Sequence, residues 1–160
     1  MSLPLRALVG LVVLVATVTA AFLLGSGGDE RLSRKEYERV VQTSYAEVRA
    51  TFRQASEASS LPDLAANLAG PQAALRAAAR ELDETEPPLD AAAANVALVR
   101  GLRGYADELT RVRRAAERGD GAFVQRFNEG VAELPSLRQL TRAFEQLRER
   151  GYDLGDIPVE

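Results

Sequence analysis

LSRKEYERVVQTSYAEVRATFRQASEAS, residues 32–59, carries the clearest helix signals in the sequence. Ser33 can cap the first turn, and Glu36 three residues later completes an S-x-x-E capping box. Leu32 and Tyr37 stand at the positions of a hydrophobic staple, which fixes the angle at which a chain enters a helix. The segment therefore predicts an amphipathic helix that begins at Ser33 and ends near Ser59. Its apolar residues recur at the spacing of one helix face: Tyr37, Val41, Tyr45, Val48, Phe52 and Ala55.

A second helix is predicted from Ser60, which can cap it, with Pro62 tolerated in the first turn. Gly70-Pro71 interrupts the pattern, because proline lacks a backbone donor and clashes with the preceding turn. We expect this helix to be kinked or split at Pro71 and to stop at Glu86-Pro87-Pro88. Its predicted inward-facing residues are Leu64, Leu68, Leu75, Ala78 and Leu82.

A third helix is predicted from Asp90 to Arg118, and Gly119-Asp120-Gly121 then supplies a C-cap and a new N-cap. The fourth predicted helix is kinked or split at Pro135 and stops at Gly151. The predicted inward-facing residues of the third helix are Val96, Val99, Leu102, Ala106, Leu109 and Val112. Those of the fourth are Phe123, Phe127, Val131, Leu134, Leu137, Phe144 and Leu147.

These elements predict an all-α protein, since no segment alternates apolar and polar residues in the period of a strand. Short connections force neighbouring helices to be antiparallel, so residues 32–151 are predicted to form an up-down-up-down four-helix bundle. The two proline interruptions also allow five or six shorter helices in a less regular array. Residues 152–160 form a tail that contains glycine and proline.

An uncharged run, ALVGLVVLVATVTAAFLLG, occupies residues 7–25. Nineteen helical residues reach about 28 Å, close to the hydrocarbon thickness of a bilayer. We therefore expect a transmembrane helix that anchors the chain, preceded by a short cytoplasmic segment, residues 1–6, and followed by a flexible tether, residues 26–31. The small residues Val18-Thr19-Ala20 and Thr19-Ala20-Ala21 leave cleavage by a signal peptidase as an alternative.

The orientation of this anchor is indicated by two patterns that disagree. Only Arg6 and the amino terminus carry positive charge before the run, whereas Arg31, Arg34, Lys35 and Arg39 follow it, which favours a cytoplasmic domain. The short basic start, long apolar core and polar Gly-Ser-Gly-Gly exit instead resemble an export signal. We expect the second pattern to decide, which places the bulk of the chain outside the cytoplasm as a single-pass membrane protein.

The composition excludes several kinds of chemistry. The sequence has no cysteine and no histidine, so it lacks thiol chemistry, Cys-based zinc sites and the commonest general base. A formal net charge of −3 provides no overall attraction to nucleic acid. No enzymatic activity, cofactor or nucleic-acid partner is therefore expected.

Two groups of acids are candidate metal sites, and neither is predicted to be one. Glu81, Asp83, Glu84 and Glu86 gather beside the diproline, where a solvated helix end explains them. Asp153, Asp156 and Glu160 lie in the tail without the spacing of a calcium-binding loop. The sequence thus predicts no metal site.

Two surfaces are candidates for contact with a partner. The first is the arginine group, Arg111, Arg113, Arg114 and Arg118, which either complements the helix dipole or receives an anionic partner. The second is the tail, where Tyr152, Leu154 and Ile157 either pack back on the bundle or bind a partner. Asn95 lies beside the core stripe, on its flank or, as the alternative, buried to set register.

The start Leu32-Ser33-x-x-Glu36-Tyr37 after an export-type segment resembles small membrane-anchored envelope proteins of high-G+C actinobacteria. The resemblance implies an envelope location and transfers no functional residue. Together these patterns predict a non-catalytic structural or interaction module whose partner is a protein or an envelope polymer. The alternative is a bundle that opens at Pro71 and Pro135 to carry a lipid or another apolar ligand.

Overall fold

The computed structural model describes residues 31–155 and 157, and all regular structure in them is helical. The helices are α1 (Arg34–Ala55), α2 (Leu61–Asn67), α3 (Ala69–Glu84), η2 (Leu89–Ala91), α4 (Ala92–Glu117), α5 (Gly121–Glu129), η3 (Val131–Glu133) and α6 (Pro135–Glu149). The all-α prediction is confirmed for this part of the chain. No helix within the described ranges has the length and apolar character needed to cross a bilayer. The predicted anchor, residues 7–25, and nearly all of the tether lie outside those ranges.

The start of α1 has the predicted capping box. The Ser33 amide donates to Glu36 Oε2 at 2.8 Å, and the Glu36 amide donates to Ser33 Oγ at 3.4 Å. Hydrogen bonds from Ser33 hold the pKa of the Glu36 carboxyl below its usual value. Leu32 packs against the core cluster that includes Tyr37, its predicted staple partner. The helix ends at Ala55, four residues before the predicted end.

The second predicted helix is split, but the interruption lies at Leu68 rather than at the proline. Pro71 is the third residue of α3, where an amide has no acceptor one turn back in its own helix, so its missing donor costs nothing. The fourth predicted helix behaves in the same way. Its interruption begins at Gly130, and Pro135 is the first residue of α6.

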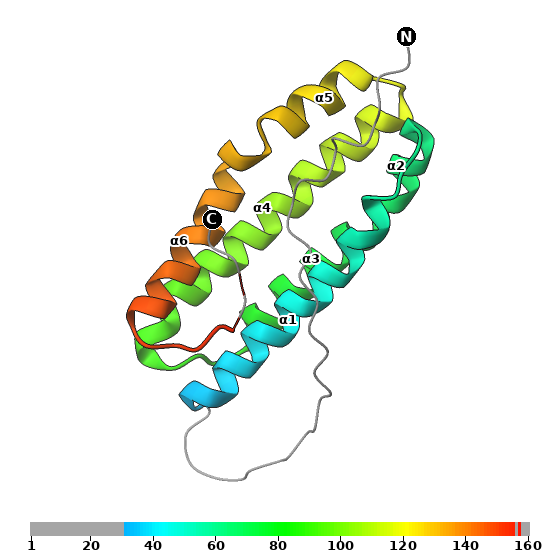
Figure 1. The fold of residues 1–160 in the computed structure, drawn as a ribbon. Helices are drawn as coiled ribbons and strands as arrows, with labels where there is room; N and C mark the ends of the chain where they lie inside the picture. The colour runs from blue at the N-terminus through cyan, green and yellow to red at the C-terminus, as the bar shows by residue number, and fades with distance from the viewer. Residues whose placement is uncertain (1–30, 156, 158–160) are drawn as a thin grey trace.

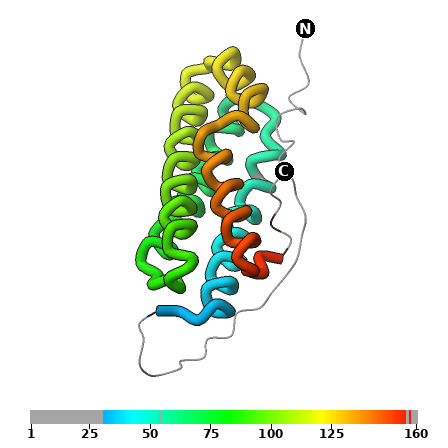
Figure 2. Tube along the Cα trace, turned by 90° about the vertical axis from the view of Figure 1, so that its left-hand side faces the viewer, coloured from blue at the N-terminus to red at the C-terminus, as the bar shows by residue number. Residues whose placement is uncertain are grey.

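The helix α4 is the centre of the arrangement, because it packs against α2, α3, α5 and α6, while α1 packs along α3. Figures 1 and 2 show the helices side by side along one long axis. The start of α1, the Pro87-Pro88 turn and residues 151–155 and 157 gather at one end, hereafter the tail end. The helix α2, the last turn of α4 and the start of α5 form the opposite, far end (Figure 1). At about 1.5 Å per residue, the 26 residues of α4 extend about 39 Å between them.

The core consists of two clusters, one towards each end. The tail-end cluster includes Tyr37, Val41, Leu98, Leu147 and Leu154; the far-end cluster includes Leu64, Leu75, Tyr105, Leu109 and Val124.

One predicted core residue is wrongly placed: Val96 is 50% exposed. The buried face of α4 is wide, because helices contact it on several sides, and it is centred near Leu98 and Tyr105. At 100° per residue, Val96 lies on the opposite face of the helix, although its spacing of three from Val99 suggested the same stripe.

Candidate functional site: the arginine group and the tail end

The arginine group lies on α4 near the far end, and the structure divides it. Arg111, Arg114 and Arg118 are exposed and follow one another at the spacing of a single helix face. Arg113 is turned to the flank, where its Nε lies 3.4 Å from Glu117 Oε1. Three cations, rather than the predicted four, are therefore presented together to solvent.

A buried acid beneath this face went unnoticed in the sequence. Glu108 is 6% exposed and accepts a hydrogen bond from the Ser136 hydroxyl of α6. Its other oxygen, Oε1, lies 4.0 Å from Arg111 Nη2, so the pair ties the arginine face to α6. The signal for this contact was Gly101-x-x-Gly104, because small residues allow another helix to approach closely.

Within the described residues, no group of three or more His, Cys, Asp or Glu side chains could hold a metal ion.

The tail residues Tyr152, Leu154 and Ile157 are buried in the tail-end cluster. The tail therefore packs back on the bundle, as the first of its two predicted readings had it, and the alternative, a partner-facing surface of these three residues, is wrong. Gly151 makes the return possible, since its φ of 81° lies in the left-handed region that favours glycine. The free energy gained by burying three large side chains outweighs the conformational entropy lost when the short tail is ordered.

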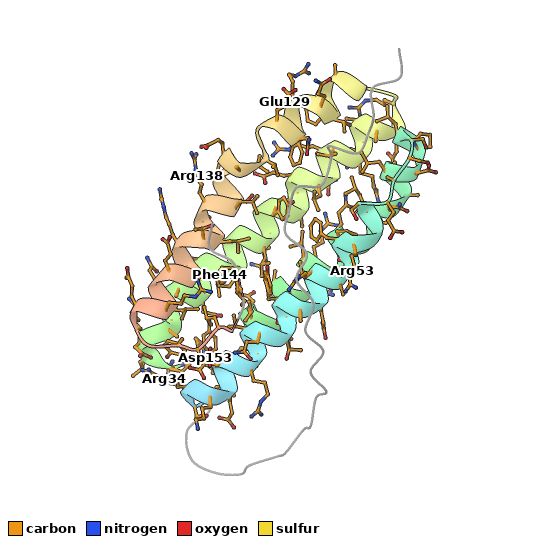
Figure 3. The ribbon with its side chains drawn as sticks, viewed as in Figure 1. Arg34, Arg53, Glu129, Arg138, Phe144 and Asp153 are labelled. Carbon is orange, nitrogen blue, oxygen red and sulfur yellow. The ribbon has the colours of Figure 1, made fainter. Side chains whose placement is uncertain are left out.

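Polar contacts fix the tail to the start of α1. Arg34 donates to the carbonyl oxygens of Arg150 and Gly151 at 3.0 and 3.3 Å, and its guanidinium lies 4.6 Å from the centre of the Tyr152 ring. The Tyr152 hydroxyl donates to Asp90 Oδ1 at 2.6 Å. Figure 3 shows Arg34 and Asp153 close together at this end. The tail thereby joins the start of α1, η2 and the end of α6.

Contacts along the body of α1 continue this attachment. The Asp153 amide donates to Glu38 Oε1 at 2.8 Å, and Gln42 Nε2 donates to the Asp153 carbonyl at 2.9 Å. Arg148 of α6 donates to the Ile157 carbonyl. The backbone of the tail is thus bound from α1 on one side and from α6 on the other.

Asn95 is buried, at 6% exposure, so its expected place on the flank of α4 is wrong. Its Oδ1 accepts a hydrogen bond from the Tyr37 hydroxyl at 2.9 Å, and its Nδ2 donates to the Leu82 carbonyl at 2.8 Å. These bonds join α1, α3 and α4 at one level. A buried amide satisfied in this way fixes the register of three helices, because sliding any of them would leave polar atoms unpaired.

The acids near the diproline are exposed, as the sequence predicted. Asp83 Oδ2 accepts a hydrogen bond from Arg103 at 2.7 Å, and Glu81 Oε2 accepts one from Ser44 at 2.8 Å. Of the three tail acids, only Asp153 is described, and its Oδ1 accepts from the Gly155 amide. Asp156 and Glu160 lie outside the described residues.

All four tyrosines of the chain are expected to resist alkaline titration while it is folded. Burial raises the pKa of Tyr37, Tyr45 and Tyr105, and burial together with the bond to Asp90 raises the pKa of Tyr152 to about 12. Unfolded tyrosines titrate near pH 10. The contribution of the protonated tyrosines to the free energy of unfolding is therefore fully present below about pH 10 and is lost as the pH rises towards 12. Phenolate absorbance should therefore appear together with unfolding. Titration of all four tyrosines near pH 10 in a folded chain would refute this.

No family model, curated protein or solved structure matches this chain. The resemblance to actinobacterial envelope proteins accordingly stays a prediction.

Proposed function

We propose that this chain is a membrane-anchored, extracytoplasmic protein of the cell envelope whose up-down-up-down bundle serves as a non-catalytic structural and interaction module. The observation that carries the proposal is the uncharged run of residues 7–25, which is long enough to span a bilayer. A polar tether follows it and leads directly into the capping box of α1. The partner is a protein or an anionic envelope polymer.

The two ends of the domain suit different roles, with the anchor at the tail end and partner binding towards the far end. Arg31, the last residue of the tether, lies at the tail end beside the Pro87-Pro88 turn. Arg111, Arg114 and Arg118 lie towards the other end of α4, which is about 39 Å long. An anchor at the tail end leaves these arginines free to meet an anionic partner away from the tether. Guanidinium groups suit this role because they bind carboxylates and phosphates through two parallel hydrogen bonds.

The test is crosslinking of the tagged full-length chain in its own host, followed by identification of what is captured. The triple variant Arg111→Gln/Arg114→Gln/Arg118→Gln should lose the partner, because it removes the exposed charges of this face. A matched control, Arg53→Gln/Arg80→Gln/Arg142→Gln, removes the same charge from exposed positions on other helices and should retain the partner. Equal capture by both variants would show that the arginine face is not the binding surface.

Carriage of a lipid or other apolar ligand is the second candidate. It is favoured by Gln72, which lies next to Pro71 in α3 with its Nε2 buried and without a hydrogen-bond partner. Half-buried Phe52, Phe123 and Phe127 border the far-end cluster near the two helix interruptions. This function requires lipid that co-purifies with the chain and raises its melting temperature when added. A chain that is free of lipid and unresponsive to it would exclude carriage.

A further inference from the structure

Two large hydrophobic residues stand out as exposed among the described residues, and both lie towards the tail end. Leu89, at the start of η2, is 76% exposed, and Val96, one turn into α4, is 50% exposed. Exposed Ala93 lies between them in sequence, and the three residues follow the i, i+4, i+7 spacing of one helix face. Leu89, Ala93 and Val96 together form a strip, hereafter the Leu89–Val96 edge. A single exposed leucine needs no explanation, but an aligned pair at one end of the domain does.

The edge lies beside the point where the tether enters the domain. The Leu32 amide donates to the Glu86 carbonyl at 2.8 Å, and Arg31 Nη1 donates to the Pro87 carbonyl at 3.2 Å. Leu89 is therefore two residues after Pro87, whose carbonyl accepts from the first described residue. Residues 26–30 are the only chain between the apolar run and Arg31. Even fully extended, five residues reach at most about 18 Å.

We infer that the Leu89–Val96 edge docks into the headgroup region of the bilayer in which residues 7–25 are anchored. The inference rests on the proposed anchoring. Two apolar side chains would hold a free domain on a membrane only weakly. A short tether changes this, because it makes the contact intramolecular, with an effective concentration in about the millimolar range. Arg100, exposed on the next turn of the same face, favours anionic headgroups.

Docking by this edge fixes the orientation of the domain relative to the bilayer. The bundle leans on the bilayer along the first turns of α4, so it does not rotate freely about its tether. Arg114 lies 18 residues beyond Val96, which is five full turns, so it is on the same face of α4 about 27 Å further along the helix. An α4 axis that rises from the bilayer at this edge carries Arg114 and its neighbours away from the surface. A second copy of the chain is the competing occupant of the edge, and the test below distinguishes it.

The chain has no tryptophan, so one introduced tryptophan reports from one position. The full chain is reconstituted in nanodiscs of phosphatidylglycerol and phosphatidylethanolamine, with or without lipids brominated near the headgroup. Ala93→Trp places the reporter in the edge. Gln146→Trp is the matched control, because Gln146 is exposed on α6 at about the same height along the bundle as Val96. Its height follows from the contact between Gly101 of α4 and Leu140 of α6, counted in opposite directions along the two helices. Val13→Trp reports on the apolar run itself.

Docking predicts that Trp emission at position 93 is blue-shifted and quenched severalfold more strongly by brominated lipid than emission at position 146. Adding Leu89→Ser and Val96→Ser to the Ala93→Trp chain should abolish the difference. If lipid quenched the tryptophan at position 13 but not the one at position 93, each measured in its own variant, the docking would be overturned and the anchor would stand. An unquenched reporter at position 13 would overturn the anchor. A blue shift at position 93 without lipid quenching would assign the edge to a second copy, and equal quenching at 93 and 146 would make the contact nonspecific.

Discussion

Deleting residues 152–160 is expected to lower the free energy of unfolding by roughly 5–9 kcal/mol, because it removes three large side chains from the core at about 1.5–3 kcal/mol each. Tyr152, Leu154 and Ile157 are all buried in the tail-end cluster. The loss is comparable to the whole stability of a typical domain, about 5–15 kcal/mol. The shortened chain should therefore be largely unfolded or melt far below the full one. Circular dichroism during urea and thermal denaturation measures this.

Two leucines provide a matched control for the effect of the tail. Leu154→Ala should cost roughly 2–5 kcal/mol, as buried leucines do. Leu89→Ala removes the same atoms from an exposed site and should change stability by less than about 0.5 kcal/mol. If the deletion and Leu154→Ala were both silent, the tail would be detached in solution and available to a partner after all.

The second large effect is expected at Gly101, where α4 and α6 meet most closely. A Cβ at this position would lie 2.6 Å from Leu140 Cγ, 2.7 Å from Leu140 Cδ2 and 3.1 Å from the Ser136 carbonyl oxygen. Gly101→Ala should therefore destabilise the domain by about 1–3 kcal/mol through overpacking. It does so although alanine is favoured over glycine in a helix interior by about 1 kcal/mol.

Gly70→Ala is the control for this substitution. Its added Cβ would meet only the Thr51 Cβ, at an ordinary contact distance of 3.9 Å. The change should be neutral or stabilise α3 by up to about 1 kcal/mol. Urea denaturation of both variants gives the comparison. A Gly101→Ala chain as stable as Gly70→Ala would mean that the two helices are not in close contact.

Helix boundaries that depend on local chemistry were predictable. Ser33 and Glu36 form their capping box within one turn of backbone, and the Asp120 side chain accepts a hydrogen bond from the Phe123 amide, three residues later, at 2.9 Å. Gly119, with a φ of 75°, ends α4 as its sequence context predicted. Such bonds join neighbours in sequence, so no knowledge of the tertiary structure is needed to foresee them.

Features that depend on tertiary contacts were not predictable in the same way. The interruptions at Leu68 and Gly130 precede the prolines, because proline is accommodated in the first turn of a new helix. Asn95 is buried because Tyr37, 58 residues earlier, supplies its hydrogen bond. The tail offered two readings in the sequence, and only the cluster around Tyr37 and Leu147 decides between them.

The candidate site was predictable only in part. Helical spacing alone places Arg111, Arg114 and Arg118 on one face. The contact of Glu108 with Ser136 joins residues 28 positions apart, and neither residue stands out in its own segment. Val96 was assigned to the core from its spacing, and its exposure became evident only once the helices around α4 were in place.

The proposed anchoring and orientation are tested most directly by labelling one cysteine in intact cells, since the chain has none of its own. Ala122 is exposed on α5 at the far end, so Ala122→Cys leaves the fold unchanged. With the domain outside, a membrane-impermeant thiol reagent should label this cysteine in intact cells to the same extent as after lysis, while a cytosolic control protein stays unlabelled. Labelling only after lysis would place the domain in the cytoplasm and contradict the proposed function.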